Sequence, residues 1–159
     1  MRYFLLDRVT GLVPGESARG IKNVTLTDEI VHDHFPDYPI FPGALIVEAA
    51  AQLAGFLLEL TFHEGGPNPP RRALLVQIDK AKFYRPAEPG DQIEFEVKLG
   101  RTLETAAQVS AEAMVQGERA MRANLTFMMK AVESERAHEQ RRRLYRLWTK
   151  GLSFGVKIP

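Results

Sequence analysis

Residues 34–60, HFPDYPIFPGALIVEAAAQLAGFLLEL, constrain the fold more than any other part of the chain. Three prolines near the start hold the backbone extended or turned, because each fixes its own φ and disfavours the α region for the residue before it. From Gly43 to Leu60 no further proline occurs, and apolar residues fall on nearly every side. A helix that is apolar all round is a buried helix. The sequence therefore predicts a core helix of about 18 residues, roughly 27 Å long, beginning next to Pro42.

Three polar side chains interrupt this helix, namely Glu48, Gln52 and Glu59. Glu48 and Gln52 are four residues apart and face the same way, whereas Glu59 is close enough to the helix end to reach water. A carboxyl group in an apolar helix is costly unless it is paired, or unless a raised pKa keeps it protonated. A protonated carboxyl at neutral pH is what a general acid needs. Upstream, His34 lies in a rigid proline-flanked segment, and a histidine titrates near neutrality.

The composition describes one ordinary globular domain rather than a specialised class of protein. The 159 residues are 45% hydrophobic and 26% charged, with a net charge of +1, so nucleic acid is not an expected partner. The chain has no cysteine, which excludes disulfides and cysteine chemistry and fits a cytoplasmic protein. The apolar run at the start is too short for a signal peptide or a membrane span. His32 and His34 share a face of an extended segment, but no third ligand is evident, so no metal is expected.

Alternating apolar residues predict strands on both sides of the helix. A short apolar element at 3–13 ends at a Val-Pro-Gly-Glu turn, and a loop rich in glycine and proline follows the helix at 63–70. The predicted strands are 17–27 before the helix and 73–85, 91–101, 104–116 and 118–131 after it, and Gln116-Gly117 predicts a hairpin between the last two. One helix against an antiparallel sheet is an α+β fold, and its open sheet edge favours dimerisation.

The tail changes character, which predicts a core domain over 1–132 and a basic helical extension over 133–159. Residues 133–150 are rich in helix formers and arginine, with Leu144, Leu147 and Trp148 at helical spacing. The favoured interpretation is a helix that docks a narrow apolar stripe on its own protomer or on a partner. A basic surface for an acidic partner and a helix lying on a membrane surface remain as alternatives.

The polar and turn residues of the opening segment stand in a distinctive order. They are His34-Phe35-Pro36, Pro39, Pro42-Gly43, Leu45, Glu48-Ala49 and Ala51-Gln52. This order resembles the signature of the FabZ-type (3R)-hydroxyacyl-acyl carrier protein dehydratases, which have the hotdog fold. The similarity extends over roughly residues 3–130, including Phe4-Leu5-Leu6-Asp7-Arg8-Val9, Ile78-Asp79-Lys80-Ala81-Lys82-Phe83, Arg85-Pro86 and Pro89-Gly90-Asp91.

The resemblance implies a catalytic pair and no metal, nucleotide or redox cofactor. His34 would remove a C2 proton from a 3-hydroxyacyl thioester, and Glu48 of the other protomer would protonate the departing C3 hydroxyl. Backbone N–H groups at Gly43 would polarise the thioester oxygen, and Gln52 would support Glu48 or a bound water. The residues expected to line the acyl site are Phe35, Ile40, Phe41, Leu45, Phe83 and Tyr84.

The resemblance also implies partners. The expected partners are an acyl carrier protein that bears a 3-hydroxyacyl chain, and a second copy of the chain in a homodimer, with a trimer of dimers as a further assembly. Carrier proteins are acidic, so Lys80, Lys82 and Arg85 are candidate docking residues, although a solvated strand face is the default interpretation.

Three departures from the family pattern leave other functions open. Asp37 replaces the usual glycine, Ala44 replaces a frequent valine, and the tail has no counterpart. The related FabA-type enzymes carry aspartate where this chain has Glu48, so isomerase activity is disfavoured. A hotdog acyl-thioester hydrolase is one alternative to dehydration. A binding protein without turnover is another, because an anion at Asp37 could keep His34 protonated.

Overall fold

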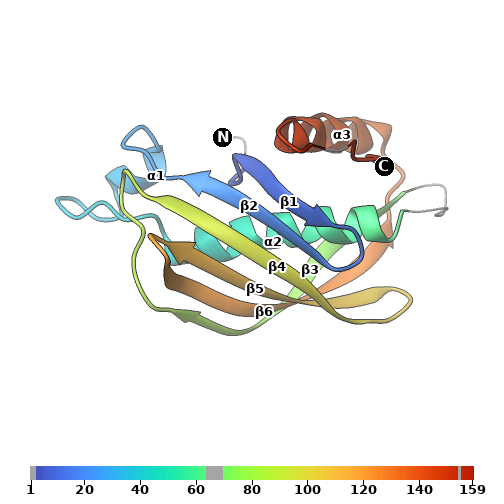
Figure 1. Ribbon diagram of the computed structural model, residues 1–159, viewed down its shortest axis with the longest axis horizontal. Coiled ribbons are helices and arrows are strands. Elements are labelled where there is room, and N and C mark those ends of the chain that lie inside the picture. The colour runs from blue at the N-terminus through green and yellow to red at the C-terminus, as the bar shows by residue number, and fades with distance from the viewer. Residues whose placement is uncertain (1–2, 64–69, 154) are drawn as a thin grey trace.

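A computed structural model of the chain describes residues 3–63, 70–153 and 155–159 (Figure 1). The loop predicted at 63–70 lies almost wholly outside these residues. In chain order the elements are β1 (Arg8–Val13), β2 (Ser17–Asn23), α1 (Glu29–His32), α2 (Gly43–Thr61), β3 (Arg71–Phe83), β4 (Gln92–Thr102), β5 (Ala106–Val115), β6 (Glu118–Ala131) and α3 (Glu135–Thr149). The predicted α+β fold is confirmed.

The six strands form one antiparallel sheet in the order β1-β2-β4-β5-β6-β3. Figure 1 shows the sheet curving around α2, as predicted from the apolar helix. All five predicted strands are present with ends shifted by a few residues, and the first apolar element contains β1. The sheet leaves β1 and β3 as its two edges.

Two predicted turns are confirmed by their backbone geometry. Gly15 has a φ of +75° in the turn after β1, where the Glu16 N–H donates to the Val13 carbonyl at 3.0 Å. Gln116 and Gly117 have φ values of +52° and +77° between β5 and β6. Two successive positive φ values match the twist of a two-residue hairpin, which explains why glycine occurs there.

The sheet buries one side of α2, whose apolar residues fill the centre of the core. By length and composition α2 could also cross a membrane, but 67% of its most apolar stretch is buried inside the protein. Such burial is typical of a core helix, which the apolar pattern predicted.

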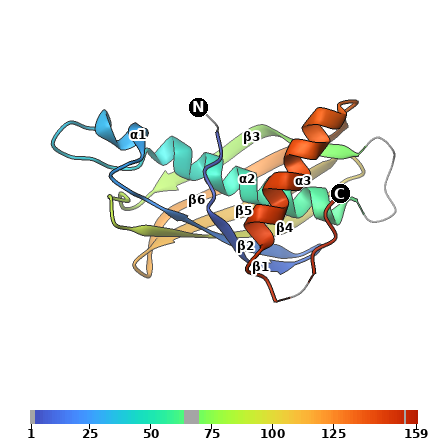
Figure 2. The same ribbon diagram turned by 90° about the horizontal axis from the view of Figure 1, so that it is seen from above.

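Helix α3 covers part of α2 that the sheet leaves open, and it crosses above α2 in Figure 2. Phe56 on α2 makes edge-on contacts with Tyr145 and Trp148, with ring centroids 4.9 Å and 6.3 Å apart. The Trp148 indole N–H donates to the Leu6 carbonyl at 3.0 Å. The predicted docking stripe is therefore present, but Leu147 is 70% exposed and Tyr145 takes its place.

A buried polar cluster fixes α3 to the core and corrects the expectation that Glu59 reaches water. Glu59 is only 2% exposed, and its carboxylate accepts from Arg72 and from the Tyr145 hydroxyl, both at 2.7 Å. Arg72 also donates to Nδ1 of His138 at 2.7 Å, and Nε2 of His138 donates to the Val132 carbonyl at 2.7 Å. Burial, followed by the Glu59 charge, raises the pKa of Tyr145 well above its ordinary value. Tyr145 therefore stays a hydrogen-bond donor.

We predict that Arg72→Met lowers the free energy of unfolding by about 3–5 kcal/mol, because it leaves the buried Glu59 carboxylate without its cation. The double variant Arg72→Met/Glu59→Gln should recover part of this loss, since the uncompensated charge is gone. Urea denaturation measures both changes. The matched control is Arg119→Ala, which removes an exposed pair with Glu112 and should cost less than about 1 kcal/mol. A loss as small for Arg72→Met as for the control would contradict the prediction.

Candidate active site

His34 lies in a loop that a tight turn closes on itself. The Phe35 N–H donates to the Tyr38 carbonyl at 2.9 Å, and the Tyr38 N–H donates to the Phe35 carbonyl at 3.0 Å. Pro36 and Asp37 form the tip of this turn, with Asp37 at a φ of +64°. Proline followed by a residue with positive φ is the pattern of a type II turn. A glycine suits the second position best, and aspartate tolerates it better than most residues.

This geometry gives the Asp37 departure a conformational explanation. Its side chain is exposed at the tip of the turn. Among the ion pairs of the described residues, none joins Asp37 to His34. The anion that would favour a protein without turnover is therefore not in contact with the histidine. The short helix α1, which leads into this loop, was not predicted, because four residues carry too little periodicity.

The His34 ring is held in one orientation by its own loop. Nδ1 lies 3.2 Å from the Ile40 carbonyl oxygen, and the Ile40 N–H donates back to the His34 carbonyl at 2.8 Å. The Phe35 ring stacks on the imidazole with centroids 4.3 Å apart. Because a carbonyl only accepts, Nδ1 carries the hydrogen, and a neutral ring therefore presents Nε2 as a base. The neighbouring His32 turns elsewhere and contacts the Leu26 carbonyl at 2.8 Å.

Glu48 and Gln52 form the pair that their spacing predicted. Gln52 Nε2 donates to Glu48 Oε1 at 3.0 Å and also to the Tyr3 carbonyl at 3.0 Å. Gln52 Oε1 accepts from the Leu5 N–H at 3.1 Å. The amide is thus fully engaged, and it fixes one oxygen of Glu48 while the N-terminal segment holds the amide in place. No donor among the described residues contacts Oε2 of Glu48.

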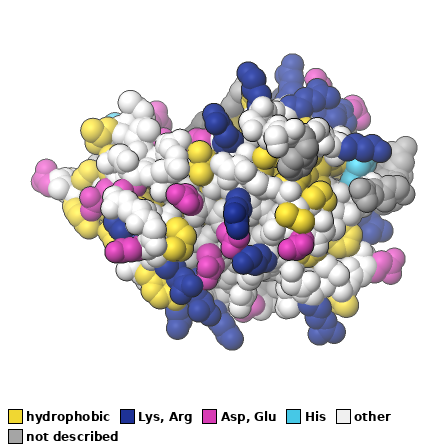
Figure 3. Space-filling view, in the orientation of Figure 1, with side chains coloured by type: hydrophobic (Ala, Val, Ile, Leu, Met, Phe, Trp, Pro, Cys, Tyr) yellow, Lys and Arg dark blue, Asp and Glu magenta, His cyan; other side chains and the backbone are white. Residues whose placement is uncertain are grey.

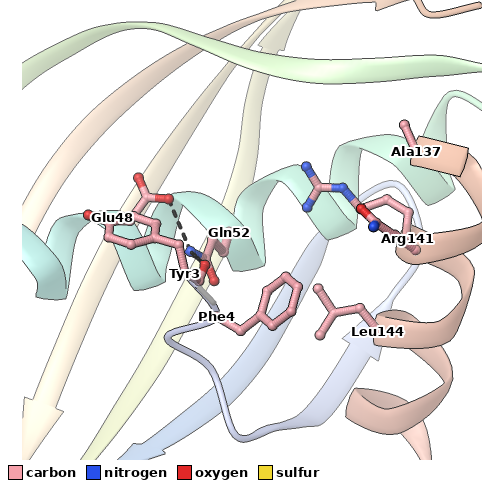
Figure 4. A pocket seen from close by; sticks show the side chains of 8 residues that line it. Tyr3, Phe4, Glu48, Gln52, Ala137, Arg141 and Leu144 are labelled. Carbon is pink, nitrogen blue, oxygen red and sulfur yellow. Dashed lines mark hydrogen bonds between the residues drawn. The ribbon is translucent and has the colours of Figure 1, made fainter. Parts of the chain in front are cut away.

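Two clefts meet at Glu48. The larger has a volume of about 360 Å³ and is drawn in Figure 4, where Arg141 reaches from α3 toward α2. The smaller has a volume of about 210 Å³ and runs along α2 toward Glu59 and β3. Glu48, Gln52 and Arg141 line both clefts, whereas His34 lines neither. Neither of these two clefts, as formed by the described residues, therefore contains both predicted catalytic residues of one protomer.

The start of α2 offers free backbone donors. The N–H groups of Leu45 and Ile46 donate to the Pro42 carbonyl, which leaves those of Gly43 and Ala44 without a partner in the described part of the chain. A methyl group added at Gly43 would lie 2.8 Å from the Phe83 ring. Glycine is therefore required for the close approach of Phe83 to the helix start.

The other predicted site residues occupy varied environments. Phe41 is 2% exposed and belongs to the core, where its N–H donates to the Ala87 carbonyl. Phe83 and Tyr84 are about half exposed, and Leu45 packs at the edge of the core. Lys80 and Lys82 are exposed. Arg85 is already bonded to the Val115 carbonyl and to Glu118, which leaves less of it for docking.

The residues of the larger cleft outside α2 were not predicted as site residues: they are Tyr3, Phe4, Ala137, Gln140, Arg141 and Leu144. Leu144 was predicted only as part of the docking stripe. Helical spacing could have predicted that one of these residues, Arg141, faces the core. Arg141 lies four residues before the buried Tyr145, so it points to the same side of α3 and toward the core.

Comparisons with known proteins agree with the motif. The FabA-like domain family matches residues 1–124. The chain is 43% identical over 116 residues to the 3-hydroxyacyl-(acyl-carrier-protein) dehydratase FabZ of Shewanella oneidensis, a match that covers 73% of this chain and 75% of that one. It is 40% identical over 134 residues to FabZ of Thioalkalivibrio sulfidiphilus, covering 83% and 90%.

Solved structures with low identity share the fold alone. The dehydratase heterocomplex ApeI:P from Xenorhabdus doucetiae gives a TM-score of 0.65 at 13% identity, covering 87% of this chain and 88% of that one. A Streptococcus mutans protein bound to acetyl CoA gives 0.63 at 14% identity, covering 84% and 96%.

We predict that the backbone conformation at residue 37, rather than its charge, limits substitution there. Asp37→Asn and Asp37→Gly should each leave the free energy of unfolding within about 0.5 kcal/mol of wild type, since both residues accept a positive φ. Asp37→Val should lower it by about 1–2 kcal/mol, because a β-branched residue is strained in the left-handed region. Urea unfolding of the three variants checks this. Equal stability of the valine and asparagine variants would refute the conformational explanation.

Proposed function

Since this chain belongs to the FabA-like family and, within it, to the FabZ-type 3-hydroxyacyl-acyl-carrier-protein dehydratases, we propose that His34 and Glu48 carry out its reaction. The chain is a hydro-lyase of fatty acid biosynthesis that removes water from 3-hydroxyacyl thioesters. Its antiparallel sheet around α2 is the hotdog fold. One observation best supports the two assignments. His34 is held through Nδ1 and Glu48 through Oε1, so Nε2 and Oε2 remain available to a substrate.

His34 serves as the base. Its Nδ1 hydrogen is held by the Ile40 carbonyl, so Nε2 takes the proton from C2 of the thioester. The Phe35 ring stacked on the imidazole restricts its rotation. The loop therefore supplies an oriented base before substrate arrives, which lowers the entropic cost of reaching the transition state.

Glu48 serves as the acid. It donates its proton to the C3 hydroxyl, which leaves as water while the C2–H electron pair forms the C2=C3 double bond of the enoyl thioester. Gln52 orients the carboxyl through Oε1 and leaves Oε2 toward the clefts. After each turnover His34 holds one extra proton and Glu48 lacks one, so proton exchange with solvent resets the pair.

The N–H groups of Gly43 and Ala44 stabilise the charge that develops on the thioester oxygen. Both are without a partner in the described part of the chain, and they lie at the positive end of the α2 dipole. Donors of this kind typically contribute about 10²- to 10³-fold to the rate. The Phe83 ring lies beside Gly43, so it forms one wall of this position.

Two protomers are needed to complete the site. His34 lines neither of the two clefts at Glu48, which supports a site that takes its histidine from a second copy of the chain. The edge strand β3 exposes Leu74, Val76 and Ile78, and unpaired strand edges with apolar side chains favour pairing with another chain. A twofold dimer joined at β3 places two such sites symmetrically, and dimers can assemble further into a trimer of dimers.

Family membership also supports a proposal for the protein that carries the substrate and for the cellular location. The relatives are named for an acyl-carrier-protein substrate, and the exposed Lys80 and Lys82 would meet an acidic carrier close to Phe83. Half-exposed Phe83 and Tyr84, together with Leu45 and Ile40, are the candidates for contact with the acyl chain. A cytoplasmic location is part of the same proposal.

We predict that His34→Ala and Glu48→Gln each lower turnover by about 10²- to 10⁴-fold, because each removes one proton-transfer group. The assay follows enoyl absorbance with a 3-hydroxyacyl thioester on acyl carrier protein and on coenzyme A. Release of free thiol without enoyl formation would instead indicate a hydrolase.

Mixing the two inactive variants tests whether one site uses both protomers. After unfolding and refolding together, half of the dimers should be mixed, and each mixed dimer contains one intact site, so roughly one quarter of the wild-type activity should return. The control is each variant refolded alone. No recovery in mixtures that contain mixed dimers would contradict a shared site.

We predict that Val76→Lys disrupts the dimer and abolishes turnover, because it places charges at the proposed β3 edge. Sedimentation velocity measures the change in mass. Val13→Lys is the matched control, since Val13 is 49% exposed on β1, the opposite edge of the sheet. A Val76→Lys protein with wild-type mass and activity would contradict dimerisation through the β3 edge.

A further inference from the structure

The cleft at Glu48 contains a cation that the proposed reaction does not use. Arg141 lines both clefts and is half-buried, yet it makes no hydrogen bond or ion pair with the described residues. Other arginines nearby are engaged, because Arg72 binds Glu59 and Arg142 binds Glu135. Arg141 comes from α3, which lies beyond the residues that the FabA-like family matches.

Helix α3 holds Arg141 rigidly over the cleft. Tyr145, one turn further along, donates to Glu59 on α2, and His138, one turn before Arg141, is bonded to Arg72 on β3. Trp148 ties the same helix to the N-terminal segment through the Leu6 carbonyl. The backbone of α3 at Arg141 is therefore held beside the clefts, and the Arg141 side chain lines both of them.

The remaining lining defines what the cleft accepts. The Gln52 amide is already hydrogen-bonded to Glu48 and to the backbone of Tyr3 and Leu5. Arg141 therefore provides the main donors that are still unused in this cleft. A guanidinium presents five N–H donors in a planar fork that suits carboxylate and phosphate groups. Tyr3, Phe4 and Leu144 add apolar walls, and Phe4 and Leu144 lie near each other in Figure 4. The cleft thus suits an apolar or flexible chain that carries an anionic oxygen group.

We propose that Arg141 makes this cleft a binding subsite for an anionic oxygen group of the substrate, a specificity element supplied by the C-terminal helix. The proposal takes the substrate class from the proposed function. Two parts of a thioester substrate carry this chemistry: a carboxylate at the end of the acyl chain, or the phosphate of the pantetheine arm. Either group would receive charge-assisted hydrogen bonds from Arg141 close to Glu48.

Most of the other cations of α3 are exposed, which distinguishes Arg141 from them. Figure 3 shows many Lys and Arg side chains gathered over the part of the molecule where α3 lies. Most of them face solvent, as Arg143 does with a side chain 77% exposed. An exposed cation gains little from an anion because water screens the pair. Arg141 alone among the α3 cations lines both clefts, so its pairing with an anion is screened less.

Binding of unreactive thioethers tests the subsite without relying on turnover. The probes are S-butylpantetheine, its 4′-phosphate, and S-(3-carboxypropyl)pantetheine, with dissociation constants measured by calorimetry on the full chain. Wild type should bind one of the anionic probes at least about tenfold more tightly than the neutral probe, which corresponds to about 1.4 kcal/mol. The anion that shows the preference identifies the source, either the pantetheine arm or the acyl end.

Arginine variants assign the preference to residue 141. Arg141→Gln should abolish it, Arg141→Lys should retain part of it, and the exposed control Arg143→Gln should keep it whole. Thermal unfolding confirms that each variant is folded. The proposal is overturned if wild type binds all three probes equally, or if the preference survives in Arg141→Gln. A wild type that shows the preference but no enoyl formation supports the subsite and removes only the dehydratase function.

Discussion

The burial of α2 is the physical constraint on which the other features depend. A helix that is apolar on nearly every side loses stability wherever water reaches it, so every side needs a cover. The curved sheet covers one side, and Tyr145 and Trp148 of α3 cover Phe56 on another. Glu48, Gln52 and Gly55 form a partly exposed stripe along α2, and the two clefts form there. The site therefore lies where the covering of the helix is incomplete.

The C-terminal helix is part of the core and of the cleft at the same time. The Glu59–Arg72–Tyr145 cluster is buried, so its loss would leave a charge without a partner and loosen α3. Arg141 and Leu144 would leave the cleft wall with it. The stability of the fold and the shape of the cleft are thus linked through one helix that lies outside the matched family residues.

The sequence was informative where local periodicity decides the structure. The apolar run predicted α2, alternation predicted the strands, and the Gln116-Gly117 pair predicted its hairpin. It failed where partners come from distant segments. The burial of Glu59 depends on Arg72 and Tyr145, and the exposure of Leu147 depends on how α3 is rotated against α2. The site was predicted as far as the Glu48–Gln52 pair, but the α3 wall of its cleft requires tertiary contacts.

One face of α2 shows how partners give two identical carboxyl groups different roles. Glu48 and Glu59 are eleven residues apart, about 16 Å along the axis, and both line the smaller cleft with Gln52 between them. Glu59 meets a guanidinium, a phenol and a backbone N–H, so its negative charge is fully matched and it serves the fold. Among the described residues, Glu48 accepts a hydrogen bond only from the neutral Gln52 amide, through one of its two oxygens. Glu59 thus fixes α3 at the closed end of this face, whereas Glu48, at the open end, is the residue that we propose as the acid.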